Sequence, residues 1–178
     1  MWGIHEAKLI QQIKKAAKIK LIWQRKEDAE YIASSYWLVK LGATAGTKIR
    51  TALFEVFGRE AQIGQSLAVY KGGVSENGMD CEKLYDTDKA TLDGGLTPIV
   101  ILKQATYPTL RLVVIGEHLL AIDNEFAEMV SDGYAVGAGA NSPIYFGSNR
   151  EILILPFRNG NNYGWLNELR SLLPGIQL

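Results

Sequence analysis

The chain has 178 residues, of which 47% are hydrophobic and 21% are charged, with 19 basic and 19 acidic side chains. This length suits one ordinary domain with a buried core, and the composition excludes a disordered or fibrous chain. A formal charge of zero excludes a uniformly basic nucleic-acid binder, although it leaves room for a local basic patch.

The cysteine content and the hydropathy of the chain indicate the cellular compartment in which the protein is expected. Cys81 is the single cysteine, so an intramolecular disulfide and a cysteine-rich metal centre are both excluded. The amino terminus lacks the apolar segment of a signal peptide, and no run approaches the roughly eighteen apolar residues of a membrane helix. We therefore expect a soluble, cytoplasmic protein with no membrane contact.

The amino-terminal segment predicts an amphipathic helix with a basic outer face, because its residues separate onto two sides with the 3.6-residue period. The apolar side consists of Leu9, Ile10, Ile13, Ala16, Ala17 and Leu21, and the basic side of Lys8, Lys14, Lys15 and Lys18. Over residues 1–26 the single acid is Glu6, against seven Lys and Arg. The basic side is either a solvated face or a surface that meets phosphate or an acidic partner.

Aromatic and β-branched residues from Tyr31 to Leu41 predict either one long strand or a hairpin that turns at Ser34-Ser35. A second helix is predicted from Thr47, which can cap it, to Gly58, which can end it. Its buried stripe consists of Ile49, Ala52, Leu53, Val56 and Phe57. The order helix, strands, helix is therefore expected in the first third of the chain.

The middle of the chain, residues 64–95, is polar and acidic, and we expect a long loop there with one short strand near its start. After Pro98, short apolar runs alternate with turn residues, which predicts several strands buried on both faces. The sequence thus predicts an α+β fold in which an antiparallel or mixed sheet packs with a few amphipathic helices. A single compact domain over residues 1–178 is expected, with a sub-division into 1–75 and 96–178 as the alternative.

Two further short helices are predicted in the second half. Asp123 or Asn124 can cap the first, over NEFAEMV, and Asn162 can cap the second, over YGWLNELRSLL. The apolar stripe of the second consists of Trp165, Leu166, Leu169, Leu172 and Leu173. Between the two helices, the glycine-rich residues 132–142 predict a mobile connection or a loop pressed against another backbone.

Few residues suggest catalysis. Gly116-Glu117 is explained as a hairpin turn, which leaves His118 at the start of the returning strand rather than in a metal site. A reactive thiol at Cys81 has little support in a polar loop. Carboxylates that could share a metal or do acid-base work are dense in the same loop, at Asp80, Glu82, Asp86, Asp88 and Asp93. We predict no cofactor and no metal, and a small metal-dependent hydrolase is kept as an alternative.

Two stretches resemble the sliding clamps, the ring proteins that keep DNA polymerases on their template. LRLVVIGEHLLAID resembles a strand–turn–strand of bacterial clamps through Gly116, His118, Leu119 and Ala121, and SPIYFGSNREILILPFR resembles the carboxy-terminal clamp strand through Leu155, Pro156, Phe157 and Arg158. The resemblance covers about half of the chain and is strongest over residues 110–158. Glu117 interrupts the Gly-His pair of the clamps, and Leu119 stands where they have Arg.

The resemblance implies a non-enzymatic protein whose helices face DNA phosphates and which assembles from several copies into a homo-oligomer. The residues it implies for salt-dependent, non-specific contact with duplex DNA are Lys8, Lys14, Lys15, Lys18, Lys48 and Arg50. It also implies that a protein partner binds beside Leu155, Pro156 and Phe157. A phage or mobile-element protein that acts on DNA-metabolic machinery is the leading hypothesis. A protein-binding inhibitor or regulator of a host system, without DNA contact, is the alternative.

Overall fold

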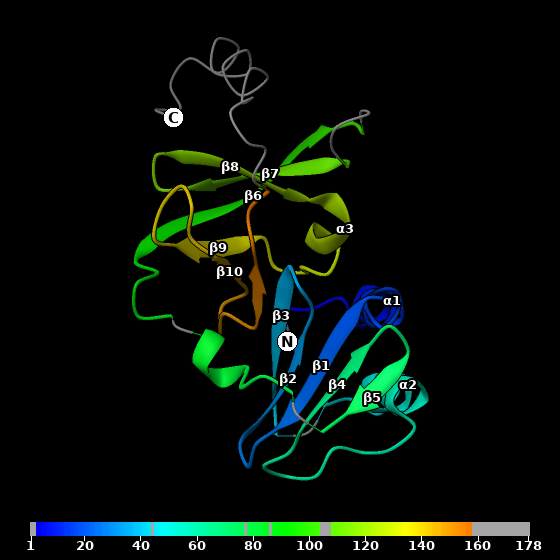
Figure 1. The fold of residues 1–178 in the computed structure, drawn as a ribbon. Coiled ribbons are helices and arrows are strands. Elements are labelled where there is room, and N and C mark those ends of the chain that lie inside the picture. The colour runs from blue at the N-terminus through cyan, green and yellow to red at the C-terminus, as the bar shows by residue number, and fades with distance from the viewer. Residues whose placement is uncertain (1–2, 44, 77, 86, 104–107, 158–178) are drawn as a thin grey trace.

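The fold is seen in a computed structural model that describes residues 3–43, 45–76, 78–85, 87–103 and 108–157. Its strands are β1 (Lys20–Arg25), β2 (Ala29–Ala33), β3 (Trp37–Gly42), β4 (Ser66–Tyr70), β5 (Gly73–Ser75), β6 (Leu92–Ile101), β7 (Leu110–Ile115), β8 (His118–Asp123), β9 (Tyr134–Gly137), β10 (Ile144–Phe146) and β11 (Ile152–Ile154). These eleven strands form one sheet in the order β5-β4-β1-β2-β3-β11-β10-β9-β6-β7-β8 (Figure 1). Every neighbouring pair is antiparallel, so the expected α+β class is confirmed and the sheet is not mixed.

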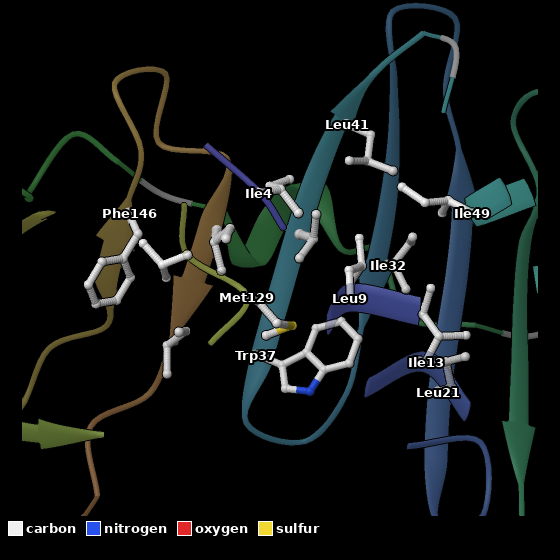
Figure 2. Packing of buried hydrophobic residues seen from close by; sticks show 14 of the residues in the cluster. Ile4, Leu9, Ile13, Leu21, Ile32, Trp37, Leu41, Ile49, Met129 and Phe146 are labelled. Carbon is white, nitrogen blue, oxygen red and sulfur yellow. The ribbon is translucent and has the colours of Figure 1, made fainter. Parts of the chain in front are cut away.

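The helices follow from their amphipathic patterns. The described helices are α1 (Glu6–Ala16), α2 (Thr47–Phe57), the four-residue α3 (Asn124–Ala127) and a short 3-10 turn, η1 (Glu82–Leu84). Leu9 and Ile13 of α1 are fully buried, and Figure 2 shows Leu9 near Ile32 and Ile13 near Leu21 of the sheet. Gly58 ends α2 in the left-handed conformation that a C-terminal glycine permits, as expected.

The sheet is covered on both faces. The larger core lies between the sheet and α1 and α2, and it extends to Met129 and Phe146 from the second half of the chain (Figure 2). On the other face a smaller core contains Tyr31, Tyr145 and Cys81, the last of these from the segment between β5 and β6. Burial on both faces explains why β10 and β11 are apolar without alternation, as the sequence predicted for strands after Pro98.

The first and last parts of the sheet join where β3 pairs with β11. Strands from residues 20–75 occupy one side of this junction and strands from residues 92–154 occupy the other. The register places Ile154 opposite Trp37 and Ile152 opposite Val39. Residues separated by more than one hundred positions in the sequence are therefore neighbours at the end of β11.

Two turn predictions are confirmed. Ser34, Ser35 and Tyr36 connect β2 and β3, which confirms the hairpin alternative for this stretch. Gly116 and Glu117 connect β7 and β8, and Gly116 has the positive φ, 55°, that the turn explanation requires.

Three local predictions are wrong. Leu21 belongs to β1 and not to the first helix, which ends at Ala16. Gly46, and not Thr47, is the N-cap of α2. The glycine-rich connection contains β9, which pairs with both β10 and β6, because main-chain hydrogen bonding there outweighs the low strand propensity of glycine. The helix predicted over residues 162–173 lies outside the described residues.

Within the described ranges, no helix has both the length and the apolar character needed to cross a membrane.

Candidate functional site

The basic residues implied by the clamp resemblance lie on α1, on α2 and in the turn that follows α1. The two helices pack against each other beside β1 and β4 (Figure 1). Most of these side chains are paired with acids of the same chain, through Lys8 Nζ–Glu128 Oε2 at 2.5 Å, Lys14 Nζ–Glu55 Oε2 at 3.1 Å, Lys15 Nζ–Glu125 Oε2 at 2.8 Å and Lys48 Nζ–Glu6 Oε1 at 3.8 Å. Lys18 is exposed, and no ion pair is seen for it among the described residues.

These ion pairs change the electrostatic character of the helical face. Glu125 and Glu128 come from α3 and the residue that follows it, more than one hundred positions from their lysines. The hydrogen bond from Lys15 lowers the pKa of Glu125, so this acid is ionised at neutral pH. Each of the four paired lysine charges is therefore opposed by a carboxylate a few ångströms away, which reduces the net positive field of the face.

Arg50 has a structural environment different from that of the lysines. Its Nη2 contacts Oε1 of Glu30 at 2.5 Å, and Glu30 is fully buried on β2. Trp23 Nε1 donates to Oε2 of the same carboxylate at 3.2 Å, and Arg25 Nε lies 3.6 Å from Oε1. A buried carboxylate requires such partners because its desolvation is costly. Arg50 thus stabilises the buried negative charge of Glu30. In the sequence, the sign of this network is Glu30, an acid within an otherwise apolar strand. Sequence reasoning missed this residue.

The predicted partner-binding residues line an apolar groove. Leu155, Pro156 and Phe157 line a cavity of about 590 Å³ together with Tyr36, Pro108, Asp123 and Phe126. Tyr36 and Leu155 are 61% and 40% exposed, so much of this apolar surface faces solvent. The rings of Tyr36 and Phe126 stack with centroids 6.3 Å apart and an interplanar angle of 19°. Sequence reasoning missed these two aromatic residues because they come from separate elements.

The groove wall is fixed by the main chain. Leu155 N donates to Tyr36 O at 2.9 Å, and Phe157 N donates to Ala121 O at 2.7 Å. Pro156 has no amide hydrogen and cannot continue the ladder, so the chain crosses at this residue from the β3 side to β8. Residues 155–157 therefore present their side chains from a backbone that main-chain hydrogen bonds fix in position.

Asp123 is the acidic side chain among the described groove residues. It caps α3 by accepting a hydrogen bond from Glu125 N at 2.9 Å, as one of the two predicted caps. Burial raises the pKa of Asp123 above its ordinary value. A negative charge in a mainly apolar groove favours a ligand that brings a hydrogen-bond donor or a basic group.

A second cavity, of about 570 Å³, lies on the other side of the sheet between the end of β3 and residues 149–151. Its lining is mixed in polarity and includes two cations, Lys40 and Arg150, and two acids, Asp28 and Glu151. The Lys40 ammonium lies 5.6 Å from the centroid of the Tyr85 ring. The balanced charges give no preference for an ionic ligand.

The residues considered for catalysis are not brought together. In the described part of the chain, no group of three or more His, Cys, Asp or Glu side chains could hold a metal ion. Asp80 interacts with Gln24 and Lys26, whereas Asp93 accepts a hydrogen bond from Tyr134. Asp86 lies outside the described residues. Burial raises the pKa of Cys81 to about 12, so its thiol is not ionised at neutral pH.

No protein-family model, no curated protein and no solved structure matches this chain. The clamp resemblance and the mobile-element origin therefore stay predictions, and the candidate site is interpreted from its own chemistry.

Replacement of Arg50 should destabilise the fold, whereas replacement of Lys48 should not. Arg50→Met removes the closest partner of buried Glu30, so we expect the free energy of unfolding to fall by about 3 kcal/mol. Lys48→Met removes an exposed pair and should change it by less than about 0.5 kcal/mol. Urea denaturation at fixed ionic strength measures both, and equal effects would contradict a structural role for Arg50.

Asp123 should make stability depend on pH in the acid range. Because its pKa is raised in the folded state, its contribution to stability is full below the unfolded value and is lost as pH rises through the folded value. Asp123→Asn keeps the cap acceptor without the charge, so it should gain stability over the wild type between pH 3 and pH 7.

The matched variant Asp123→Ala also lacks the charge but loses the cap. We expect it to be less stable than Asp123→Asn by about 1 kcal/mol at every pH. Thermal unfolding of the three proteins across this range provides the measurement. A constant difference between wild type and Asp123→Asn would show that burial does not shift the titration.

Proposed function

We propose that this chain is a non-enzymatic interaction protein that binds an apolar segment of a partner protein in the groove between Tyr36 and Phe157. The observation that carries the proposal is the groove itself, in which partly exposed apolar side chains from several elements surround a cavity of about 590 Å³. Exposed apolar surface arranged around a concavity is typical of a binding site.

The fixed backbone of residues 155–157 favours binding of a partner segment. Ordering a loop at an interface costs free energy, and a wall that is already fixed avoids that cost. Here the amide of Leu155 donates a hydrogen bond to Tyr36 O, next to β3, and the amide of Phe157 donates one to Ala121 O of β8. Neither bond requires a partner. The ring of Phe126 stacks on that of Tyr36, another residue of the groove. The groove is therefore preformed.

The chemistry of the groove specifies the partner. The aromatic and aliphatic walls accept a large apolar side chain such as Leu, Phe or Trp. Asp123 lies among them and is partly buried, so it favours a Lys, an Arg or an amide donor next to the apolar group. The expected ligand is a short peptide segment with an apolar residue beside a basic one, from a host regulator or from DNA-metabolic machinery.

Selection from a displayed library of random twelve-residue peptides tests this proposal. Binders should be enriched in aromatic or leucine residues next to Lys or Arg. Tyr36→Ala and Leu155→Asp should each weaken their binding about ten-fold or more, because each removes a central apolar contact.

The matched control is Ile63→Asp, which alters another exposed apolar residue, 62% exposed, outside the groove. It should leave peptide binding unchanged. Binders that tolerate both groove variants, or that lose affinity equally with Ile63→Asp, would refute the assignment. Fluorescence polarisation with labelled copies of the selected peptides gives the affinities.

A clamp-like protein that contacts DNA is the second candidate, and one arrangement favours it. Two helices, α1 and α2, lie together on one face of an extended antiparallel sheet and carry lysines on their outer surfaces. Exposed ion pairs contribute about 0–1 kcal/mol to stability, so DNA phosphates could replace the carboxylates as partners of the lysines. Opposing acids nevertheless reduce the attraction, and a ring would also require several copies of the chain.

Filter binding of duplex DNA separates the candidates. If the helical face contacts DNA, replacement of Glu55, Glu125 and Glu128 by Gln should raise the affinity at low salt about ten-fold. The charge reversals Lys14→Glu and Lys18→Glu should abolish binding, and affinity should fall steeply with salt. Absence of binding at low salt by both the wild type and the Gln variant would eliminate the DNA candidate.

A further inference from the structure

A further apolar cavity adjoins the candidate groove. Its volume is about 390 Å³, and Tyr36 and Leu155 line both this cavity and the groove. Its other lining residues include Leu38 of β3, which belongs to the smaller core, and Met79 and Leu84, which come from the segment between β5 and β6. The two cavities therefore meet at Tyr36 and Leu155, the residues that the bond from Leu155 N to Tyr36 O holds together.

Exposed apolar side chains gather around both cavities. Met79 and Leu84 are 44% and 45% exposed, and Tyr36 and Leu155 are also exposed. Single exposed apolar residues are ordinary on a protein surface, whereas several of them around adjoining concavities are typical of an interaction surface. The apolar surface available to a partner therefore extends beyond the groove.

The segment that carries Met79 and Leu84 is fixed to the sheet between these two residues. Gln24 of β1 is buried, and its Nε2 donates to Asp80 Oδ1 at 3.1 Å while its Oε1 accepts from Cys81 N at 2.8 Å. Leu84 N in turn donates to Cys81 O at 3.1 Å. This cavity is therefore bounded by a fixed main chain, as the groove is, so binding there avoids the free-energy cost of ordering a loop.

The two cavities carry opposite charges. Asp123 lines the groove, and Lys20 of β1 lines the adjoining cavity. Across the part of the chain that the structure describes, neither side chain forms an ion pair. Charge-assisted hydrogen bonds are stronger than neutral ones, so a basic residue of a partner is favoured beside Asp123 and an acidic residue beside Lys20.

We propose that one extended partner segment occupies both cavities, with an apolar side chain in each, a basic residue beside Asp123 and an acidic residue beside Lys20. The proposal rests on the function proposed for the groove and specifies the partner more closely, as a peptide with two apolar anchors between opposite charges. Adjoining cavities of this size have centres on the order of 10 Å apart, a distance that two to four residues of extended chain span at about 3.3–3.6 Å each.

Variants of residues that line only the adjoining cavity test the proposal. The probes are fluorescein-labelled copies of the twelve-residue peptides selected by display with the wild-type protein. Met79→Asp and Leu84→Asp should each lower their affinity about five-fold or more, because each places a charge beside the second apolar anchor. Val74→Asp is the matched control, since Val74 is 40% exposed and lines neither cavity. It should leave the affinity unchanged.

Charge reversal tests the role of Lys20. Lys20→Glu should lower the affinity about five-fold for selected peptides that carry an acidic residue beyond the second anchor. A new selection with this variant should replace that acid by Lys or Arg. Lys18→Glu makes the same change of charge outside both cavities and should alter neither result.

Alanine variants of the peptide assign each anchor to its cavity, and they do so with the unchanged protein. Replacing the apolar residue nearer the peptide's acid should lower the affinity for the wild type about ten-fold. The same replacement should lower the affinity for Met79→Asp less than two-fold, because residues in contact are energetically coupled. Equal losses with both proteins would show that this peptide residue does not lie beside Met79, which would contradict the proposal.

The outcomes separate this proposal from the function on which it rests. Affinity that falls with Asp123→Asn but is unchanged by Met79→Asp, Leu84→Asp and Lys20→Glu would overturn the two-cavity segment and leave the groove assignment in place. Affinity that falls with these three variants but is unchanged by Asp123→Asn and Phe157→Ala would place the peptide in the adjoining cavity alone and contradict both. Failure to select any peptide would remove the proposed function, and this inference with it.

Discussion

The pairing of β3 with β11 is the constraint on which the candidate site depends. It is the point where strands from residues 20–75 meet strands from residues 92–154 in one sheet. Because Ile154 lies opposite Trp37, the next residue, Leu155, bonds to Tyr36, and Pro156 then ends the ladder. Phe157 turns to β8, and these steps leave a groove with a fixed wall. The groove is a consequence of sheet register and of one proline.

Ion pairing limits what the helical face can do. A row of lysines on a single helix suggests a phosphate-binding surface when the helix is considered alone. In the fold, acids from α2, α3 and the start of α1 lie against these lysines, and Arg50 serves a buried carboxylate. Local neutrality favours recognition by apolar contacts over attraction of a polyanion. The apolar groove and the helical face therefore favour partners of different chemistry.

The sequence predicted the features that depend on local patterns. The stripe of α1, the hairpins at Ser34-Ser35 and Gly116-Glu117 and the end of α2 at Gly58 follow from periodicity and turn chemistry. The strand β9 was missed because part of its support comes from β6, which is remote in the sequence. The same reason applies to the site: Leu155, Pro156 and Phe157 were named from the sequence, but Tyr36 and Phe126 join them through tertiary packing. The acids that pair with the lysines are equally remote in sequence.

Residue-resolved amide hydrogen exchange, with and without a selected peptide, tests most directly whether β3–β11 pairing preforms the groove. In the free protein, the amides of Leu155 and Phe157 should exchange as slowly as that of Lys40, which donates to Glu151 O across the same strands at 2.8 Å. Peptide binding should slow them further and should leave α1 unaffected. Rapid exchange of Leu155 and Phe157 in the free protein, or peptide protection confined to other elements, would contradict the account.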